Sequence, residues 1–286
     1  NKKISIDGDK SLSIRWALLA SQAIGKSRAY NLLKSEDVIN TLNCLKKLGV
    51  KINFKKNYCE ITGKGLNSYT YKNNLTLNAG NSGTLGRLIL GLLIHSKKKI
   101  KLIGDKSLSR RDFSRITEPL KKFGAKFDSN GKNKLPLSIT GSEFIKPINY
   151  LENKGSAQCK SSIMLAALNT AGETYIKAKK SRNHTELLFK YLKIPIKIKK
   201  TKHFDFIKIK GKEKIQSFNY KIPADISSSA FFIVLTALSE SSKLMIKSVN
   251  VNSSRTGVIK ILKKMGVKII IKNKKNYKGE GIADIF

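Results

Sequence analysis

Apolar and polar positions follow one pattern four times along this chain. The segment Leu45-Lys-Lys-Leu-Gly-Val-Lys-Ile52 is repeated at 120–127 and 262–269, and 189–196 is a degenerate copy. Each copy predicts the end of an amphipathic helix, in most copies at a glycine, and then a strand. The expected cap positions, 49, 124, 193 and 266, lie about 70 to 75 residues apart, which indicates an internal repeat.

A second kind of helix recurs with the same period. It is apolar nearly all round, which predicts burial, and it opens on small hydroxyl residues. The four starts are Ser11 and Ser13 before WALLASQAI, Ser82 and Thr84 before LILGLLI, Ser156 and Ser161 before IMLAAL, and Ser227 to Ser229 before AFFIVLTAL. With strands between the two kinds of helix, each repeat is predicted to be a βαβαββ unit. Four such units fill the chain, in an α/β (α+β) fold.

Length and residue spacing narrow the class of protein. A chain of 286 residues is long enough for two domains. The longest apolar run, 88–94, is far shorter than the ~18 residues of a membrane helix, and no secretory segment opens the chain. Three scattered cysteines and three distant histidines form neither a disulfide framework nor a metal site. We therefore expect a protein of the reducing cytoplasm.

The formal net charge of +38 allows several interpretations. Nucleic acid, an anionic membrane surface and acidic small substrates would each suit it. We favour compositional drift, because the excess is nearly all Lys, and Lys, Asn and Ile share A/T-rich codons. Lysines such as Lys46, Lys47 and Lys121 lie on predicted solvated helix faces, without the interleaved aromatic residues that single-strand binders use.

The hydroxyl-rich helix starts are candidate anion sites. A helix start offers unpaired N–H groups and a partial positive charge, although Ser and Thr there can simply be caps. Lys10, Arg15, Arg87 and Lys160 favour the anion interpretation, because a cap needs no cation. The basic segment 104–111 follows a predicted strand and is either an exposed turn or a further anion site. Several such starts around one cleft would bind more than one anion.

Seven segments, in order and spanning essentially all 286 residues, resemble the 5-enolpyruvylshikimate-3-phosphate (EPSP) synthase family, also called 3-phosphoshikimate 1-carboxyvinyltransferases. The segments are GDKSLSIR (8–15), NAGNSGTLGR (78–87), SLSRRDFSR (107–115), SAQCKS (156–161), RNHTE (182–186), PADISSSAFF (223–232) and VNVNSSRTGVIKILKKMG (249–266). The forms S-A-Q-x-K, R-x-H-x-E and G-D-K are similar to the class II branch. Asn252-Ser-Ser-Arg255 departs from the N-x-T-R of that branch, which blurs the subclass more than the function.

The resemblance implies residue roles that agree with the anion sites. Residues expected to bind shikimate-3-phosphate are Lys10, Ser11, Arg15, Ser156, Ala157, Gln158 and Ser181. Residues expected to bind phosphoenolpyruvate are Lys10, Asn81, Gly83, Thr84, Arg111 and Gln158. The implied reaction transfers the enolpyruvyl group to the 5-hydroxyl of shikimate-3-phosphate and releases phosphate, with no metal and no cofactor. It belongs to the shikimate pathway, which leads to chorismate and the aromatic amino acids.

The resemblance also implies how the chain is organised. The family fold has six βαβαββ units in two domains, of which this chain would hold four. Residues 1–9 would supply a strand of domain I, 10–222 would form domain II from three units, and 223–286 would return into domain I. The general acid and base would lie beyond Phe286, so no catalytic residue is assigned here. Because the chain starts without Met and stops in an apolar stretch, we expect a fragment truncated at its C-terminus, from a monomeric enzyme.

Two alternatives stay open at this stage. The UDP-N-acetylglucosamine enolpyruvyl transferase shares the fold, but it has Lys-Asn where this chain has Lys10-Ser11, and a loop Cys that has no counterpart near Arg111. A basic nucleic-acid-binding module related to RNA 3′-phosphate cyclase shares the βαβαββ unit, but it needs a nucleotide-linked His that the three histidines do not convincingly supply. We expect no nucleic-acid and no membrane partner. Cys159 is interpreted as a small helix residue rather than a nucleophile.

Overall fold

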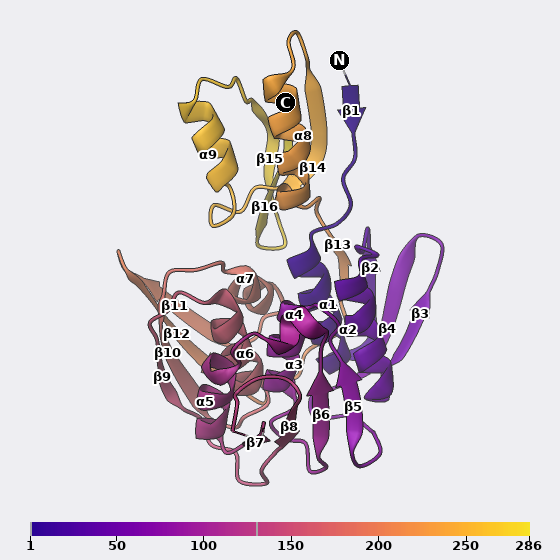
Figure 1. The fold of residues 1–286 in the computed structure, drawn as a ribbon, viewed down its shortest axis with the longest axis vertical. Helices are drawn as coiled ribbons and strands as arrows, with labels where there is room; N and C mark the ends of the chain where they lie inside the picture. The colour runs from indigo at the N-terminus through magenta and orange to yellow at the C-terminus, as the bar shows by residue number, and fades with distance from the viewer. Residues whose placement is uncertain (1, 130) are drawn as a thin grey trace.

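A computed structural model describes residues 2–129 and 131–286 and shows four consecutive βαβαββ units (Figure 1). The first unit contains β1 (Lys2–Ile4), α1 (Lys10–Gln22), β2 (Ile24–Tyr30), α2 (Glu36–Lys47), β3 (Lys51–Phe54) and β4 (Tyr58–Lys64). The second contains β5 (Leu75–Asn78), α3 (Gly83–Leu92), β6 (Ile100–Ile103), the short α4 (Lys106–Ser109), α5 (Ser114–Phe123), β7 (Lys126–Asp128) and β8 (Leu137–Thr140).

The other two units repeat this order of elements. The third contains β9 (Asn149–Glu152), α6 (Ala157–Leu168), β10 (Glu173–Lys179), α7 (His184–Tyr191), β11 (Ile196–Lys200) and β12 (Phe204–Lys210). The fourth contains β13 (Asn219–Lys221), α8 (Ile226–Leu238), β14 (Leu244–Asn250), α9 (Gly257–Lys264), β15 (Ile271–Tyr277) and β16 (Glu280–Ile285). The predicted α/β class and its repeated unit are thus confirmed.

The first and fourth units exchange their first strands. The second and third units each close a sheet of their own, in the orders β5-β6-β8-β7 and β9-β10-β12-β11. β1 instead pairs in parallel with β14, and β13 pairs in parallel with β2, which gives the sheets β1-β14-β16-β15 and β13-β2-β4-β3. The chain therefore crosses twice between two bodies, and the two crossing segments meet at a bridge between Gly8 and Ala224.

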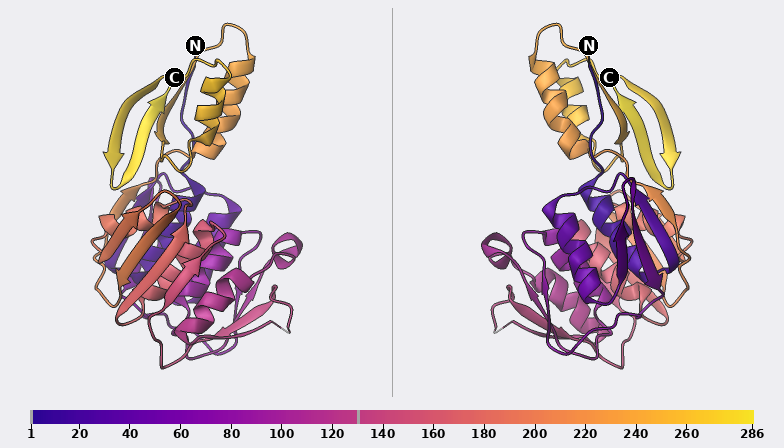
Figure 2. Two further views of the ribbon diagram at one scale, coloured as in Figure 1. Left: turned by 90° about the vertical axis from the view of Figure 1, so that its left-hand side faces the viewer. Right: turned by 90° about the vertical axis from the view of Figure 1, so that its right-hand side faces the viewer.

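The two bodies have separate hydrophobic cores. One core runs from Leu12 to Ile222, and the other runs from Ala224 to Ile285 and includes the partly buried Ile4 and Ile6. We call residues 10–221 the three-sheet body, and β1 with residues 226–285 the single-sheet body. Figures 1 and 2 show the single-sheet body standing above one end of the three-sheet body, joined to it by the two crossings.

Helices α1, α3 and α6 form the centre of the three-sheet body. Every residue of α1 from Leu12 to Gln22 is buried, and so are all residues of α6 from Cys159 onward. α3 and α6 lie very close together: a Cβ placed on Gly91 of α3 would come within 2.2 Å of the Ser162 carbonyl oxygen of α6. A glycine at this position lets the two backbones approach. The predicted burial of these three helices is confirmed.

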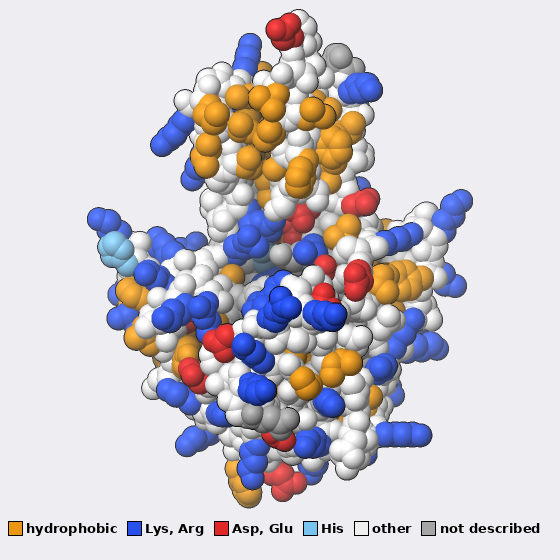
Figure 3. Space-filling view, viewed as in Figure 1, with side chains coloured by type: hydrophobic (Ala, Val, Ile, Leu, Met, Phe, Trp, Pro, Cys, Tyr) orange, Lys and Arg blue, Asp and Glu red, His pale blue; other side chains and the backbone are white. Residues whose placement is uncertain are grey.

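The fourth apolar helix, α8, contradicts the predicted burial. Only Ile226, Ser229 and Ile233 of this helix are buried, whereas Phe231 is 80% exposed and Leu238 is 81% exposed. Figure 3 shows the apolar side chains gathered over the single-sheet body. The reason is that α8 packs on one sheet only, while α1, α3 and α6 are enclosed by three units. The apolar sequence of a helix does not by itself supply a partner for each face.

The helix ends of the repeat fall where they were predicted. Gly49, Gly124, Lys193 and Gly266 all adopt the left-handed conformation that ends a helix, with φ of 84°, 119°, 57° and 91°. The strand that follows the fourth helix end is an exception. This strand, β15, begins at Ile271, beyond the predicted 267–269. Among the helices that the structure describes, none combines the length and the apolar character of a membrane span.

Candidate functional site

The starts of the four apolar helices are all capped by side chains. Ser82 accepts a hydrogen bond from the Leu85 N–H at 3.2 Å, and Ser156 accepts one from the Cys159 N–H at 3.2 Å. α1 and α8 use aspartates instead: Asp9 accepts from Leu12, and Asp225 accepts from Ser227. Lys10 and Ser11 therefore lie inside the first turn of α1 rather than ahead of it.

Arginine side chains cluster around Gly83 at the start of α3. A Cβ on Gly83 would lie 3.0 Å from Nη1 of Arg87 and 3.1 Å from Nη1 of Arg111. Arg111 Nη2 donates to the Asn81 side-chain oxygen at 3.1 Å. Burial, together with the charges of Arg111 and Arg115, lowers the pKa of Arg87. No carboxylate pairs with Arg87 or Arg111 within ion-pair distance in the described part of the chain, so the cluster suits an anionic ligand.

Gln158, at the start of α6, connects this cluster to a neighbouring pocket. Its side-chain oxygen accepts from Arg87 Nη1 at 2.5 Å, and its amide nitrogen donates to Thr84 Oγ1 at 3.0 Å. Gln158 also lines a pocket of about 720 Å³, together with Ser156, Ala157 and Ser181. The structure therefore brings together Asn81, Gly83, Thr84, Arg111 and Gln158, five of the six residues that the family resemblance implied for phosphoenolpyruvate, while Lys10 lies at Asp37.

The pocket beside Gln158 carries polar groups suited to a phosphate. The Ser181 hydroxyl is buried and has no hydrogen-bond partner within the described residues. The wall also includes Lys180, Arg182 and Lys200, and Ser253 and Ser254 close it from the single-sheet body. A pocket with this composition is polar and basic, and it is built by both bodies.

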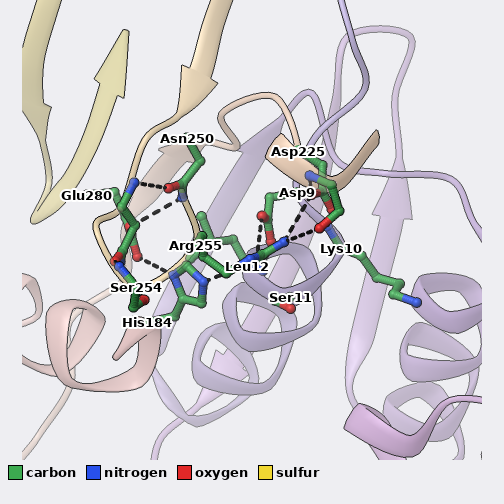
Figure 4. Close-up of polar contacts among 12 residues, drawn as sticks. Asp9, Lys10, Ser11, Leu12, His184, Asp225, Asn250, Ser254, Arg255 and Glu280 are labelled. Carbon is green, nitrogen blue, oxygen red and sulfur yellow. Dashed lines mark hydrogen bonds and ion pairs between the residues drawn. The ribbon is translucent and has the colours of Figure 1, made fainter. Parts of the chain in front are cut away.

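The other predicted residues of the first helix lie outside this pocket's wall. Arg15 is buried and donates to the hydroxyls of Thr185 at 2.8 Å and Ser161 at 3.1 Å, and burial lowers its pKa to about 10. Lys10 is half exposed, its Nζ lies 3.4 Å from Asp37, and its side chain points away from Arg255 (Figure 4). Ser11 is partly exposed, and its carbonyl accepts from Arg15 at 3.1 Å. That Lys10, Ser11 and Arg15 bind a substrate together with the residues of the pocket stays a prediction.

Lys160 differs from the expectation for an anion ligand. Its ammonium is fully buried and lies 2.6 Å from the Glu186 carboxylate, which neutralises it inside the three-sheet body. Cys159 is also buried, and burial raises the pKa of its thiol to about 12, as expected for a packing residue. No cluster of His, Cys, Asp and Glu able to hold a metal occurs among residues 2–129 and 131–286.

A buried ionic network, which the sequence reasoning missed, joins the two bodies (Figure 4). Arg255 Nη1 lies 3.1 Å from the Asp9 carboxylate, and Nη2 lies 3.2 Å from the Asp225 carboxylate. His184 Nε2 lies 3.3 Å from Arg255 Nη1, and His184 Nδ1 lies 2.7 Å from Glu280 Oε1. We call Asp9, His184, Asp225, Arg255 and Glu280 the junction cluster.

The pKa values in the junction cluster shift in opposite directions. Burial and the neighbouring Asp225 raise the pKa of Asp9, although Arg255 opposes this. Burial also acts to raise the pKa of Glu280, but hydrogen bonds from His184, Asn250 and Asn252 lower it overall. One signal was present in the sequence: Asp9 and Asp225 occupy the same position, just before the apolar helix, in the first and fourth units. Their common partner Arg255 was noted in the sequence only as part of the segment Asn252-Ser-Ser-Arg255, which gave no indication of a contact with Asp9 or Asp225.

Comparison with known proteins matches the chain over nearly its full length. A search of sequence families matches residues 1–281 to EPSP synthase (3-phosphoshikimate 1-carboxyvinyltransferase). The 3-phosphoshikimate 1-carboxyvinyltransferase of Thermoanaerobacter sp. (strain X514) is 41% identical over 283 residues, which cover 99% of this chain and 65% of that protein. The protein of the same name from Bacillus subtilis (strain 168) is 36% identical over 285 residues, with the same two coverages.

A solved structure agrees with these relatives. EPSP synthase from Acinetobacter baumannii superposes with a TM-score of 0.89 at 36% sequence identity, over 99% of this chain and 64% of that one. The chain thus spans about 65% of the length of the curated relatives that it matches.

Proposed function

This chain belongs to the EPSP synthase family, and from that premise we propose that its pocket and its arginine cluster bind shikimate-3-phosphate and phosphoenolpyruvate. The observation that carries the proposal is the position of Gln158. Its side chain lines the polar pocket with Ser156 and Ser181, and it also bonds to Arg87 in the cluster around Gly83. Two adjoining anion sites suit a reaction between two phosphorylated substrates.

The proposed reaction is the transfer of an enolpyruvyl group. The 5-hydroxyl of shikimate-3-phosphate loses its proton and attacks C2 of phosphoenolpyruvate while C3 gains a proton. C3 then loses a proton as the C2–O bond to phosphate breaks, which regenerates the double bond and releases phosphate. Arg111, beside Asn81 and Thr84, would neutralise phosphoenolpyruvate, while Ser156, Ala157 and Ser181 would hold the phosphorylated shikimate. Fixed cations of this kind stabilise charge that develops on the reacting groups.

Lys10, Ser11 and Arg15 complete the proposed set of ligands. In this assignment Lys10 would leave Asp37 when substrate binds and contact both substrates, because its pairing with Asp37 is partly exposed and therefore weak. Ser11 and Arg15 would contact shikimate-3-phosphate from α1. Arg15 already lies with its guanidinium against neutral hydroxyls, so no carboxylate has to be displaced.

The domain division and the cellular setting are also proposed. Residues 10–222 would form one domain, and residues 1–9 and 223–286 would belong to the other. The exposed face of α8 would be covered by the further units that the family fold contains. We propose a monomeric, cytoplasmic transferase of the shikimate pathway, with no nucleic-acid partner. Proton transfer is assigned to units of the family fold that residues 1–286 do not contain, so these residues alone should bind substrates with negligible turnover.

The binding proposal is tested by titrating residues 1–286 with shikimate-3-phosphate and then with phosphoenolpyruvate, followed by phosphorus NMR. Arg111→Ala should weaken phosphoenolpyruvate binding about tenfold or more and leave shikimate-3-phosphate binding nearly unchanged. Ser181→Ala should do the reverse. Arg28→Ala is the matched control, because it removes an arginine that pairs with Glu60 and does not line the pocket. Binding of a UDP-sugar without binding of shikimate-3-phosphate would overturn the proposal.

A further inference from the structure

The hydrogen-bonding capacity of Arg255 is almost fully used inside the junction cluster. Nη1 donates to Asp9 at 3.1 Å and faces His184 Nε2 at 3.3 Å. Nη2 donates to Asp225 at 3.2 Å and to the Ser227 hydroxyl at 2.7 Å. Each of the four Nη hydrogens therefore has its own acceptor. A guanidinium engaged in this way holds protein groups together instead of awaiting a ligand.

The geometry around His184 defines the state of its ring. An arginine N–H can only donate, so the Nε2 atom that faces Arg255 must accept and carries no proton. Nδ1 then carries the proton and donates to Glu280, and neither of these two side chains is exposed. The second oxygen of Glu280 accepts from Asn250 at 3.2 Å and from Asn252 at 3.0 Å.

These contacts connect the two bodies at the pocket. His184 begins α7 of the three-sheet body, whereas Glu280 lies on β16 of the single-sheet body. Asn252 also accepts from the hydroxyl of Ser254 at 2.7 Å, and Ser254 lines the pocket. Asp9, which caps α1, directly precedes Lys10 and Ser11. One network thus determines where the single-sheet wall of the pocket lies relative to the start of α1.

We propose that Arg255, held by His184, is a positioning residue that sets the placement of the single-sheet body over the pocket. It acts through Asp9 and Asp225, the caps of the first helix on each side of the junction. The identity of the ligand rests on the proposed function, whereas the positioning role of Arg255 does not. Without the network, the two crossings would still connect the bodies and would allow hinge motion between them.

The test measures the distance between the bodies and the affinity for shikimate-3-phosphate. Spin labels are placed at Lys121→Cys in α5 and Lys263→Cys in α9, both exposed positions, and pulsed electron resonance gives the distance distribution. The three native cysteines are buried, and burial raises their thiol pKa values, so they should label poorly. Arg255→Ala and His184→Ala should widen the distribution about twofold and weaken binding about tenfold.

Two variants separate positioning from general loss of structure. In His184→Gln the amide offers one N–H to Glu280 and one oxygen to Arg255, so it should restore both readouts. Arg28→Ala, which removes an ion pair within the three-sheet body, should change neither. If Arg255→Ala leaves the protein too unstable to label, Glu280→Gln alters the contact of His184 with Glu280, which joins the same two bodies, and should widen the distribution.

The two readouts fail independently. An unchanged distance distribution in His184→Ala and Glu280→Gln, or equal widening in Arg28→Ala, would overturn the positioning role whatever the ligand. A distribution that widens as expected, in a chain that never binds shikimate-3-phosphate, would support the positioning role and refute the proposed function.

Discussion

The two bodies of the molecule use the same repeated unit with opposite results for its apolar helix. In the three-sheet body, α1, α3 and α6 pack against one another between three sheets and are almost completely buried. In the single-sheet body, α8 contacts one sheet and leaves Phe231, Leu235 and Leu238 exposed. A single βαβαββ unit covers one face of its helix, and the other faces depend on neighbouring units.

The comparison explains where the candidate site lies. The buried helices converge within their first two turns, since Gln158 of α6 contacts Thr84 and Arg87 of α3, and Ser161 of α6 contacts Arg15 of α1. Close packing of the three helices thus brings three capped starts together, with Arg87 beside Gln158 and Arg15 beside Ser161. The single-sheet body has one such start and contributes loop residues to the pocket, chiefly Ser253 and Ser254.

The sharpest test of this difference is a pair of leucine truncations. Leu165→Ala in α6 removes a buried side chain and should lower the free energy of unfolding by about 3 kcal/mol, because it leaves a cavity. Leu235→Ala in α8, where the leucine is 63% exposed, should cost less than about 0.5 kcal/mol. Urea unfolding followed by Trp16 fluorescence measures the first, and hydrogen exchange of β14 measures the second. Equal costs would show that α8 is covered in solution.

A pair of glycine substitutions tests helix approach in each body. Gly91→Ala should destabilise the three-sheet body by about 2 kcal/mol, because the new methyl meets the Ser162 backbone at the α3–α6 contact. Gly257→Ala at the start of α9 meets no atom within 4 Å, so it should be neutral or stabilise by a few tenths of a kcal/mol. Thermal unfolding by circular dichroism checks both. A neutral Gly91→Ala would contradict the close contact of α3 with α6.

The junction between the bodies should respond to acid. Because the folded pKa of Glu280 is lowered, its charge stabilises the folded state above the ordinary value near 4.5, and that contribution is lost as pH falls through the folded pKa. Glu280→Gln should cost about 1.5 kcal/mol at pH 7, and the difference from the parent should shrink below about pH 4.5. Unfolding curves from pH 7 to pH 3 measure this. A difference that grows in acid would reverse the inferred sign.

The smallest expected effect on stability concerns exposed phenylalanines in the two bodies. Phe231→Ser on α8 and Phe144→Ser in the three-sheet body, where the rings are 80% and 89% exposed, should each change stability by less than about 0.5 kcal/mol. Only Phe231→Ser should reduce binding of a hydrophobic dye, because Phe231, Leu235 and Leu238 lie on one exposed face of α8, whereas Phe144 lies on no helix. Equal dye binding in both variants would argue against an open face on α8.

Much of the fold was predictable because its signals are local. The left-handed residues at 49, 124, 193 and 266 end helices through their own backbone conformation, so the repeat and its period could be read directly. Asn81, Thr84, Arg111 and Gln158 were found as candidates through the family resemblance, and the structure places them together. The burial of α8 was predicted wrongly, because apolar composition shows what a helix can bury but not what is available to bury it.

The sequence by itself determined the repeated unit, the helix caps and the residue types offered to two anions, since each depends on neighbours along the chain. The exchange of β1 and β13 between sheets, and the meeting of Arg255 with Asp9, were decided only by tertiary structure. β13 and β1 have the same position in their units, so local pattern cannot assign either strand to its sheet. Arg255 and Asp9 lie 246 residues apart, and only the pairing of the two crossings brings them within hydrogen-bond distance.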